Sequence, residues 1–418
     1  METLRGKIIA AVDGGTGVRE YLGLDITLIK VALVIYDFAD PSHPIISYYP
    51  LLENDENYSL YTDFGVNKAS NVGALVNFRR ILAENSIVLQ MLENVNPTPD
   101  LIILDGSLQI PPIANFYSLI HSHPKLCYDV FESYRRLYTL CHEQDITLIG
   151  SVKDSKVPQF RDLIIRALPF YLKTFCSPGQ GNSLLTVNYR QQLQGFSDYE
   201  LLCQLLEPSF RTAIIHQKMD FRLNPPSLSN ISDTSQKSSD SADIMALSHL
   251  FGVKFPYEVL YSYFRFSKQD LPLRFEFLVH PNSTISQNLS LFHEAIRMLS
   301  PISVIESQCT LPLPQIEAHL RAHLPPRELD MIVEPLTAQF NVPLQGRYIN
   351  NFPVDTVLPS SVGSSIAANS PEISPKISPG ISPGISSVVD SEISSGVSPY
   401  SPYSPFIEKR HVRLDQLF

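Results

Sequence analysis

The sequence lacks an apolar run that approaches the roughly 18 residues of a membrane-spanning helix. The first apolar run, Ile8 to Val12, is too short for the core of a signal peptide. The five cysteines are widely spaced and form no C-x-x-C pair, which argues against a zinc knuckle and against a disulfide framework. These absences predict a protein of the reducing cytoplasm that does not enter a membrane.

Charge is also scarce, because charged residues make up 18% of the 418 residues and leave a formal net charge of −10. Such a chain does not coat nucleic acid through bulk positive charge, although it can still grip DNA in a local groove. Hydrophobic residues supply 44% of the chain. This share is enough to bury a core and excludes a wholly disordered or fibrous protein.

Short apolar runs alternate with amphipathic segments over the first 350 residues. Buried strands are predicted at 7–12, 101–104 and 146–152, and residues 22–38 predict either one long strand or a hairpin of two buried strands. Helices are predicted at 67–92 and 116–144. Strands that alternate with helices indicate an α/β core. We therefore expect one enlarged domain over residues 1–350.

Two segments are rich in residues that build no core. Residues 223–243 consist largely of Ser, Asn, Asp and Pro, and predict a flexible loop inside the domain. Residues 357–405 contain a ragged Ile-Ser-Pro repeat and predict a disordered Ser/Pro/Gly-rich tether. The tail that follows, 406–418, ends in apolar residues and suits a peptide that docks in a partner groove, such as that of a sliding clamp. An unstructured end without a partner is the alternative.

Three acidic residues stand where ligands bind in α/β sheets. Asp13 and Asp105 each follow a predicted buried strand, and Glu84 lies on the predicted helix between them. Asp13 and Asp105 would converge if their strands are neighbours. Clustered carboxylates suit Mg²⁺ or Mn²⁺, and two such ions can hold the attacking water and the leaving oxygen of a phosphodiester. Alternatively, Asp13-Gly14 and Asp105-Gly106 are ordinary turns.

Five further residues extend this candidate set. Lys153 and Asp154 follow the predicted strand at 146–152, where the lysine can contact a phosphate or the pair can form a surface turn. Arg79 and Arg80 supply local positive charge, or they form a solvated helix face. His319 lies on a segment that prolines open as a helix, and its imidazole can bind a metal or move a proton. A structural histidine is the alternative there.

The order and spacing of these motifs resemble those of the NurA nuclease family. The matching segments are Ala11-Val12-Asp13-Gly14-Gly15, Arg80 with Glu84, residues 101–108, 149–155, 263–266 and 273–277, and Ala318-His319. Together they cover the chain from about residue 7 to about residue 345. Each motif is short, so the resemblance rests on their common order.

The resemblance implies an α/β fold with an RNase H-like mixed sheet flanked by helices. It implies a Mn²⁺- or Mg²⁺-dependent deoxyribonuclease with two ions, which acts as a 5′-to-3′ exonuclease and single-strand endonuclease in end resection during double-strand break repair. The implied metal-binding and catalytic residues are Asp13, Glu84, Asp105 and His319, and the candidates for contacting DNA are Lys153, Asp154, Arg79 and Arg80. The implied partners are single-stranded DNA and duplex ends, a second copy of the chain, and a HerA-type hexameric ATPase.

Two other functions compete with a nuclease. Leu311 stands eight residues before His319, where the family often has a tyrosine, so a catalytically inactive repair scaffold is one alternative. The other is an actin-like kinase or ATPase, because V-D-G-G-T-G at 12–17 resembles the phosphate turn of that fold. A kinase also needs later glycine-rich turns, and the 18 glycines provide no convincing ones. A Walker A loop is absent as well.

Overall fold

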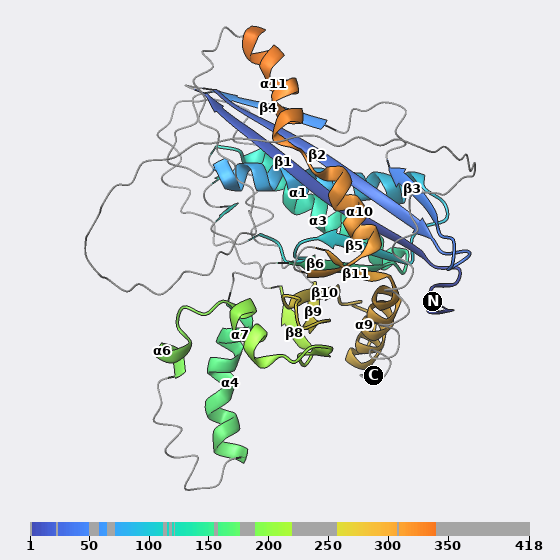
Figure 1. Cartoon of the computed structure of the whole chain (residues 1–418), viewed down its shortest axis with the longest axis vertical. Helices are drawn as coiled ribbons and strands as arrows, with labels where there is room; N and C mark the ends of the chain where they lie inside the picture. Colours follow the sequence, from blue (N-terminus) through green and yellow to red (C-terminus); the bar gives the residue numbers. More distant parts are fainter. Residues whose placement is uncertain are drawn as a thin grey trace, which may run out of the picture.

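A ten-stranded mixed sheet forms the centre of the molecule (Figure 1). The computed structural model describes residues 2–21, 24–49, 58–64, 72–111, 115–116, 119–120, 122–153, 158–175, 189–219, 257–306 and 309–339. Asp154, the predicted loop 223–243, the tether 357–405 and the tail 406–418 lie outside these ranges. Within them, no helix combines the length and the apolar character needed to cross a membrane.

The first half of the sheet positions the candidate residues. It contains β1 (Ile8–Tyr21), β2 (Leu24–Asp37), β3 (Ile45–Tyr49), β4 (Tyr58–Phe64), β5 (Leu101–Asp105) and β6 (Thr147–Val152). β2 pairs antiparallel with β1, β3 and β4, whereas β1, β5 and β6 pair parallel. The order β3-β2-β1-β5-β6, with helices on both faces, confirms the predicted RNase H-like mixed sheet.

Antiparallel strands extend the sheet beyond β6. They are β7 (Phe210–Arg211), β8 (Ile215–Lys218), β9 (Glu258–Arg265) and β10 (Leu273–Leu278), in the order β6-β10-β9-β7 with β8 also paired to β9. A separate hairpin, β11 (Ser303–Glu306) and β12 (Cys309–Pro312), leads directly into a helix. This hairpin therefore fixes where that helix begins.

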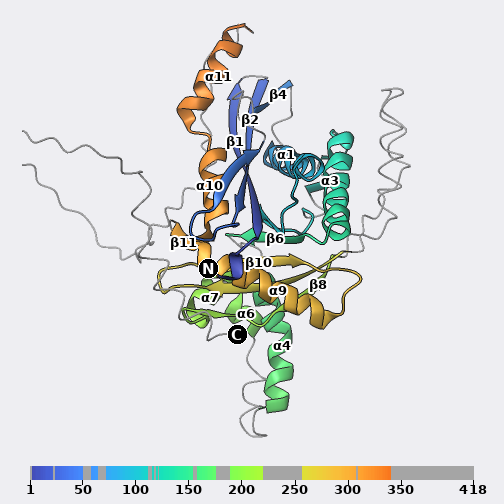
Figure 2. The same cartoon turned by 90° about the vertical axis from the view of Figure 1, so that its right-hand side faces the viewer.

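Helices cover both faces of the first half of the sheet (Figure 2). The helices of the described residues are α1 (Val72–Asn94), α3 (Pro124–Glu143), α4 (Gln159–Phe175), α6 (Tyr189–Leu193), α7 (Asp198–Leu205), α9 (Ile285–Leu299), α10 (Leu313–Ala322) and α11 (Pro326–Gln339), with 3₁₀ turns at Glu2–Leu4 and Ser300–Ile302. α1 and α3 lie on one side of β1, and α10 lies on the other. Because β1 is covered twice, its first residues are apolar on both faces: Val12 joins the core under α1 and α3, and Ala11 joins the opposite core.

The prediction that the first strand ends at Asp13 is wrong. β1 continues to Tyr21, and Gly14 and Gly15 pair with Val31 and Lys30 of β2. These glycines allow other parts of the chain to approach the strand closely, and they do not form a turn. A Cβ at Gly14 would lie 2.6 Å from Glu84 Oε1, and one at Gly15 would lie 1.9 Å from the carbonyl oxygen of Ala322. The proposed phosphate turn at 12–17 is thus part of a regular strand, which removes the main support for a kinase.

Gly15→Ala is expected to destabilise the protein by at least about 2 kcal/mol, because the new methyl group meets backbone at the end of α10 rather than a flexible side chain. Denaturant unfolding measures this change. Gly73→Ala is the matched control, since Gly73 lies in α1 with open space at its Cβ. It should be neutral or stabilise by up to about 1 kcal/mol. Equal effects of the two substitutions would contradict the close contact.

Candidate metal centre

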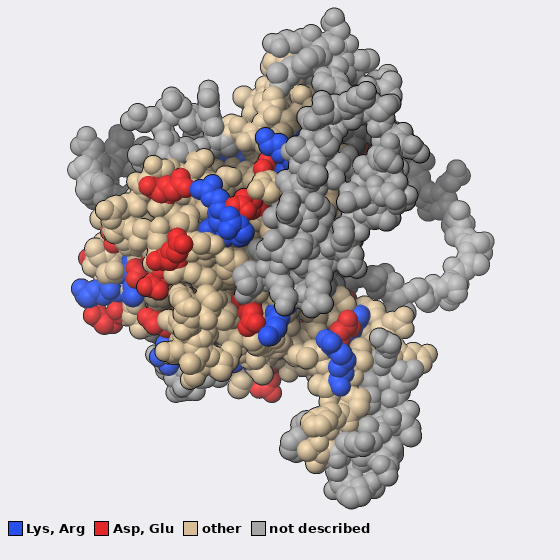
Figure 3. All heavy atoms as spheres, turned by 180° about the vertical axis from the view of Figure 1, so that it is seen from behind, with Lys and Arg blue, Asp and Glu red and all other residues tan. Residues whose placement is uncertain are grey.

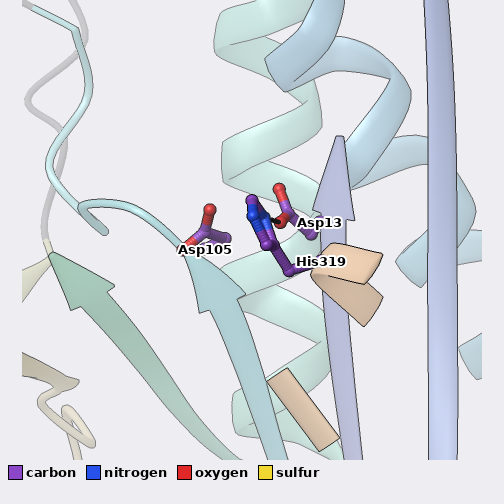
Figure 4. A group of neighbouring side chains, drawn as sticks. All are labelled: Asp13, Asp105 and His319. Atoms are coloured by element: carbon purple, nitrogen blue, oxygen red, sulfur yellow. Dashed lines mark hydrogen bonds and ion pairs between the residues drawn. The ribbon is translucent and has the colours of Figure 1, made fainter. Parts of the chain in front are cut away.

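Asp13 and Asp105 lie close together because the parallel strands β1 and β5 separate beside them. The last pair of the β1–β5 ladder is Val12 with Leu104, so the two aspartates are the next residues along. β5 ends there, whereas β1 continues beside β2. Figure 4 shows both carboxylates in the space where the strands separate. The convergence of the two aspartates was predicted on the condition that their strands are neighbours, and β1 and β5 are neighbours.

His319 reaches the same place from α10 (Figure 4). Pro314 lies in the first turn of α10, a position where proline favours helix initiation. Nδ1 of His319 lies 2.6 Å from Oδ2 of Asp13. One ligand atom from each of Asp13, Asp105 and His319 lies within 4.8 Å of the other two. The His319 side chain is 47% exposed, so this cluster is open to solvent on the side of α10.

Two donors hold Asp105 from the other side. Gln315 Nε2 donates to Asp105 Oδ1 at 2.8 Å, and Lys153 Nζ lies 3.0 Å from the same oxygen. The next residue, Gly106, has a φ of +121°, which suits glycine. Sequence reasoning did not identify Gln315. The available signal was its spacing of four residues before His319, which places both side chains on one face of a helix.

Glu84 lies beside this cluster but pairs with a cation of its own. Arg80 Nη1 donates to Glu84 Oε1 at 2.5 Å, one helical turn away on α1. Glu84 is buried, and it is not a member of the three-residue group found in the described part of the chain. Burial raises the pKa of Glu84 to about 8, with Arg80 opposing the shift and the nearby Asp13 and Asp105 adding to it.

The neighbouring carboxylates push each other's pKa values apart. Burial and the charge of Asp13 raise the pKa of Asp105. The pKa of Asp13 is lowered, because hydrogen bonding to His319 and the charge of Lys153 outweigh the effect of burial. The hydrogen bond to Asp13 in turn raises the pKa of His319. A divalent cation would offset the repulsion that keeps these acids from ionising together.

The donor set fits such a cation. Two carboxylates and one imidazole supply oxygen and nitrogen ligands of the kind that bind Mn²⁺, and carboxylates also suit Mg²⁺. Beside them, Gln315 Oε1 is buried and has no hydrogen-bond partner among the described residues. A hydrated ion would give this oxygen a partner.

The predicted DNA-contacting cations are held in ion pairs. Both terminal nitrogens of Arg79 bind Asp63, at 2.6 and 2.7 Å, and attach β4 to α1. Arg79 is 8% exposed, so it forms a structural ion pair rather than a solvated helix face. Lys153 pairs with Asp105. On the described part of the face in Figure 3, basic and acidic side chains are interspersed and form no basic patch.

Leu311 offers no polar contact at the position where the family often has tyrosine. It lies on β12, pairs with Val304 and is buried in the apolar core that faces α9 and α10. The departure from the family pattern is therefore a packing feature in this chain.

Comparison with known proteins identifies the family. The family model described as the NurA domain matches residues 7–304. Among solved structures, the chain resembles the NurA nuclease from Sulfolobus solfataricus, with 14% identity, a TM-score of 0.44, and coverage of 80% of this chain and 84% of that one. It also resembles a NurA structure bound to dAMP and manganese, with 12% identity, a TM-score of 0.31, and coverage of 80% and 88%.

None of the curated proteins compared with the sequence matches it. The family model includes Asp13, Glu84 and Asp105 but ends before His319, so the family match does not cover the histidine that the geometry places in the cluster. The match nevertheless spans well over half of the 418 residues. This chain belongs to the NurA domain family.

Proposed function

We propose that the protein is a metal-dependent deoxyribonuclease whose centre is formed by Asp13, Asp105 and His319. The observation that carries the proposal is the convergence of these three side chains where β1 and β5 separate. Asp13, Asp105 and His319 would hold the ion. When bound, the ion polarises a phosphoryl oxygen and makes water a stronger nucleophile.

The protein side chains divide the remaining work. Asp13 accepts from His319 Nδ1, which orients the imidazole and leaves Nε2 as the nitrogen that would bind the ion. Lys153, 3.0 Å from Asp105, places a positive charge beside the site that attracts the scissile phosphate. Arg80 binds Oε1 of Glu84, so in the two-ion scheme Glu84 would bind the second ion through its other oxygen or by releasing Arg80.

The finer points rest on family membership. We propose 5′-to-3′ exonuclease and single-strand endonuclease activity in DNA end resection and double-strand break repair, with Mn²⁺ or Mg²⁺, in the cytoplasm. We also propose a homodimer that works with a HerA-type hexameric ATPase. A sliding clamp bound by the tail 406–418 stays a prediction, because the tail lies outside the described residues.

Degradation of end-labelled single-stranded and duplex DNA tests the proposal. Purified full-length protein is incubated with Mn²⁺, with Mg²⁺ or with EDTA, with and without the host's HerA-type ATPase. Mn²⁺ is tested first because manganese is present in a solved NurA structure. We expect metal-dependent cleavage that EDTA abolishes. Failure to cleave with the ATPase and either metal present would contradict the nuclease and favour the scaffold.

A further inference from the structure

Two donors of different charge converge on one oxygen of Asp105. Gln315 Nε2 and Lys153 Nζ lie 2.8 and 3.0 Å from Oδ1. The lysine adds positive charge that competes with a cation for Asp105, whereas the amide adds none. Gln315 therefore orients the carboxylate without lowering its attraction for a divalent ion.

The other end of the Gln315 amide has no partner. Gln315 is fully buried, at 0% exposure, and its Oε1 accepts no hydrogen bond from the described residues. An unsatisfied buried acceptor costs about 1–3 kcal/mol. Unsatisfied buried groups of this kind are rare in native proteins and call for a specific explanation. The neighbouring carboxylates and imidazole supply one, since they suit a hydrated cation.

α10 places two side chains on the two aspartates at once. Gln315 binds Asp105 and His319 binds Asp13, one helical turn apart. α10 is anchored between these residues by Ile316 and Ala318, which are buried in the core. Its start is set by the β11–β12 hairpin. α10 thus holds both aspartates from a single rigid element.

We propose that Gln315 is a positioning residue of the metal centre. Its Nε2 holds Asp105 in place, and its Oε1 accepts a hydrogen bond from the hydration shell of the bound divalent cation. The inference rests on the proposed function and names a further residue of the same site. Nothing in the family motifs that match this chain includes Gln315.

Binding of Mn²⁺ to the metal-free protein, followed by electron paramagnetic resonance, tests this role separately from catalysis. Gln315→Met keeps the side-chain volume but removes both amide contacts, and we expect a 10- to 100-fold loss of Mn²⁺ affinity. Gln315→Glu restores an acceptor and adds charge. It should bind Mn²⁺ within about threefold of the wild type or more tightly, because carboxylate oxygen is a favoured ligand of this ion.

A residue that only packs α10 would give the opposite ranking. The Gln315→Met variant would then bind Mn²⁺ like the wild type, and Gln315→Glu, which buries a charge, would lose Mn²⁺ affinity. The line shape of bound Mn²⁺ adds a second measurement, since it reports ligand symmetry rather than packing. We expect the shape to change in Gln315→Met.

Thr310→Val is the matched control. Thr310 is buried on β12 just before α10 and donates to Asp270 at 2.6 Å, so its loss should lower stability without changing Mn²⁺ affinity. Unchanged affinity in Gln315→Met, or a loss above tenfold in Gln315→Glu, would overturn the inference. If the wild type still cleaves DNA, either of these results would overturn only the role of Gln315 and not the proposed nuclease function. Absent Mn²⁺ binding by the wild type would overturn both.

Discussion

Replacing Asp13 or Asp105 by asparagine is expected to lower the rate of metal-dependent DNA cleavage about 10³-fold. Each substitution removes a charged ligand from a group whose ligand atoms lie within 4.8 Å of one another. An ion that stabilises the transition state by several kcal/mol has an effect of this size. Single-turnover cleavage of end-labelled DNA at saturating Mn²⁺ measures the change.

The stability of the Asp105→Asn variant provides a second test. Because the charge of Asp13 raises the pKa of Asp105, removing one carboxylate relieves repulsion. Asp105→Asn should therefore unfold no more easily than the wild type in EDTA, and Mn²⁺ should stabilise the wild type more than the variant.

Asp145→Asn makes the same chemical change at a distance. Asp145 lies before β6, at the end opposite the site, and its side chain is 92% exposed. The variant should cleave DNA at the wild-type rate. More than a tenth of the wild-type rate in either Asp13→Asn or Asp105→Asn would exclude that aspartate from the centre.

In the absence of metal, the free energy of unfolding is expected to fall as pH rises from about 5 to about 8.5, and Glu84→Gln should remove much of this fall. The folded-state pKa of Glu84 is about 8, against an ordinary value of 4.5. The folded protein therefore holds a proton that the unfolded chain releases. This contribution is fully present below pH 4.5 and is lost as pH rises through 8.

The expected difference between wild type and Glu84→Gln is up to about 4 kcal/mol across that window, since each pKa unit corresponds to about 1.4 kcal/mol. Urea unfolding in EDTA at several pH values measures it. Saturating Mn²⁺ should reduce the slope of the wild type, because a cation near Glu84 favours its ionised form.

Glu93→Gln is the matched control, because Glu93 lies on the same helix and is 52% exposed in a surface pair with Arg136. Its pH dependence should run parallel to that of the wild type. A parallel curve for Glu84→Gln as well would show that the buried carboxylate does not hold a proton.

Local pattern predicted the elements that carry most of the site. The apolar run 101–104 bounded by Asp105-Gly106 became β5, and the amphipathic stretch around Glu84 became α1. Side-chain periodicity and turn residues are properties of neighbouring positions, so they can be predicted from the sequence. The choice of Asp13 and Asp105 as a pair also followed from their positions at predicted strand ends.

Contacts between distant segments decided the rest. Gly14 and Gly15 look like a turn locally, yet they continue β1 because they pair with β2. Glu84 and the end of α10 lie too close on either side of the strand to leave room for a side chain there. Whether His319 was a ligand or a structural residue depended on Asp13, 306 positions away. Gln315 belongs to no sequence motif, and only its burial and its hydrogen bond to Asp105 identify it as part of the site. Residue types and spacing thus determined which strands, helices and acids were available. Non-local packing, which no short-range pattern encodes, determined which side chains meet.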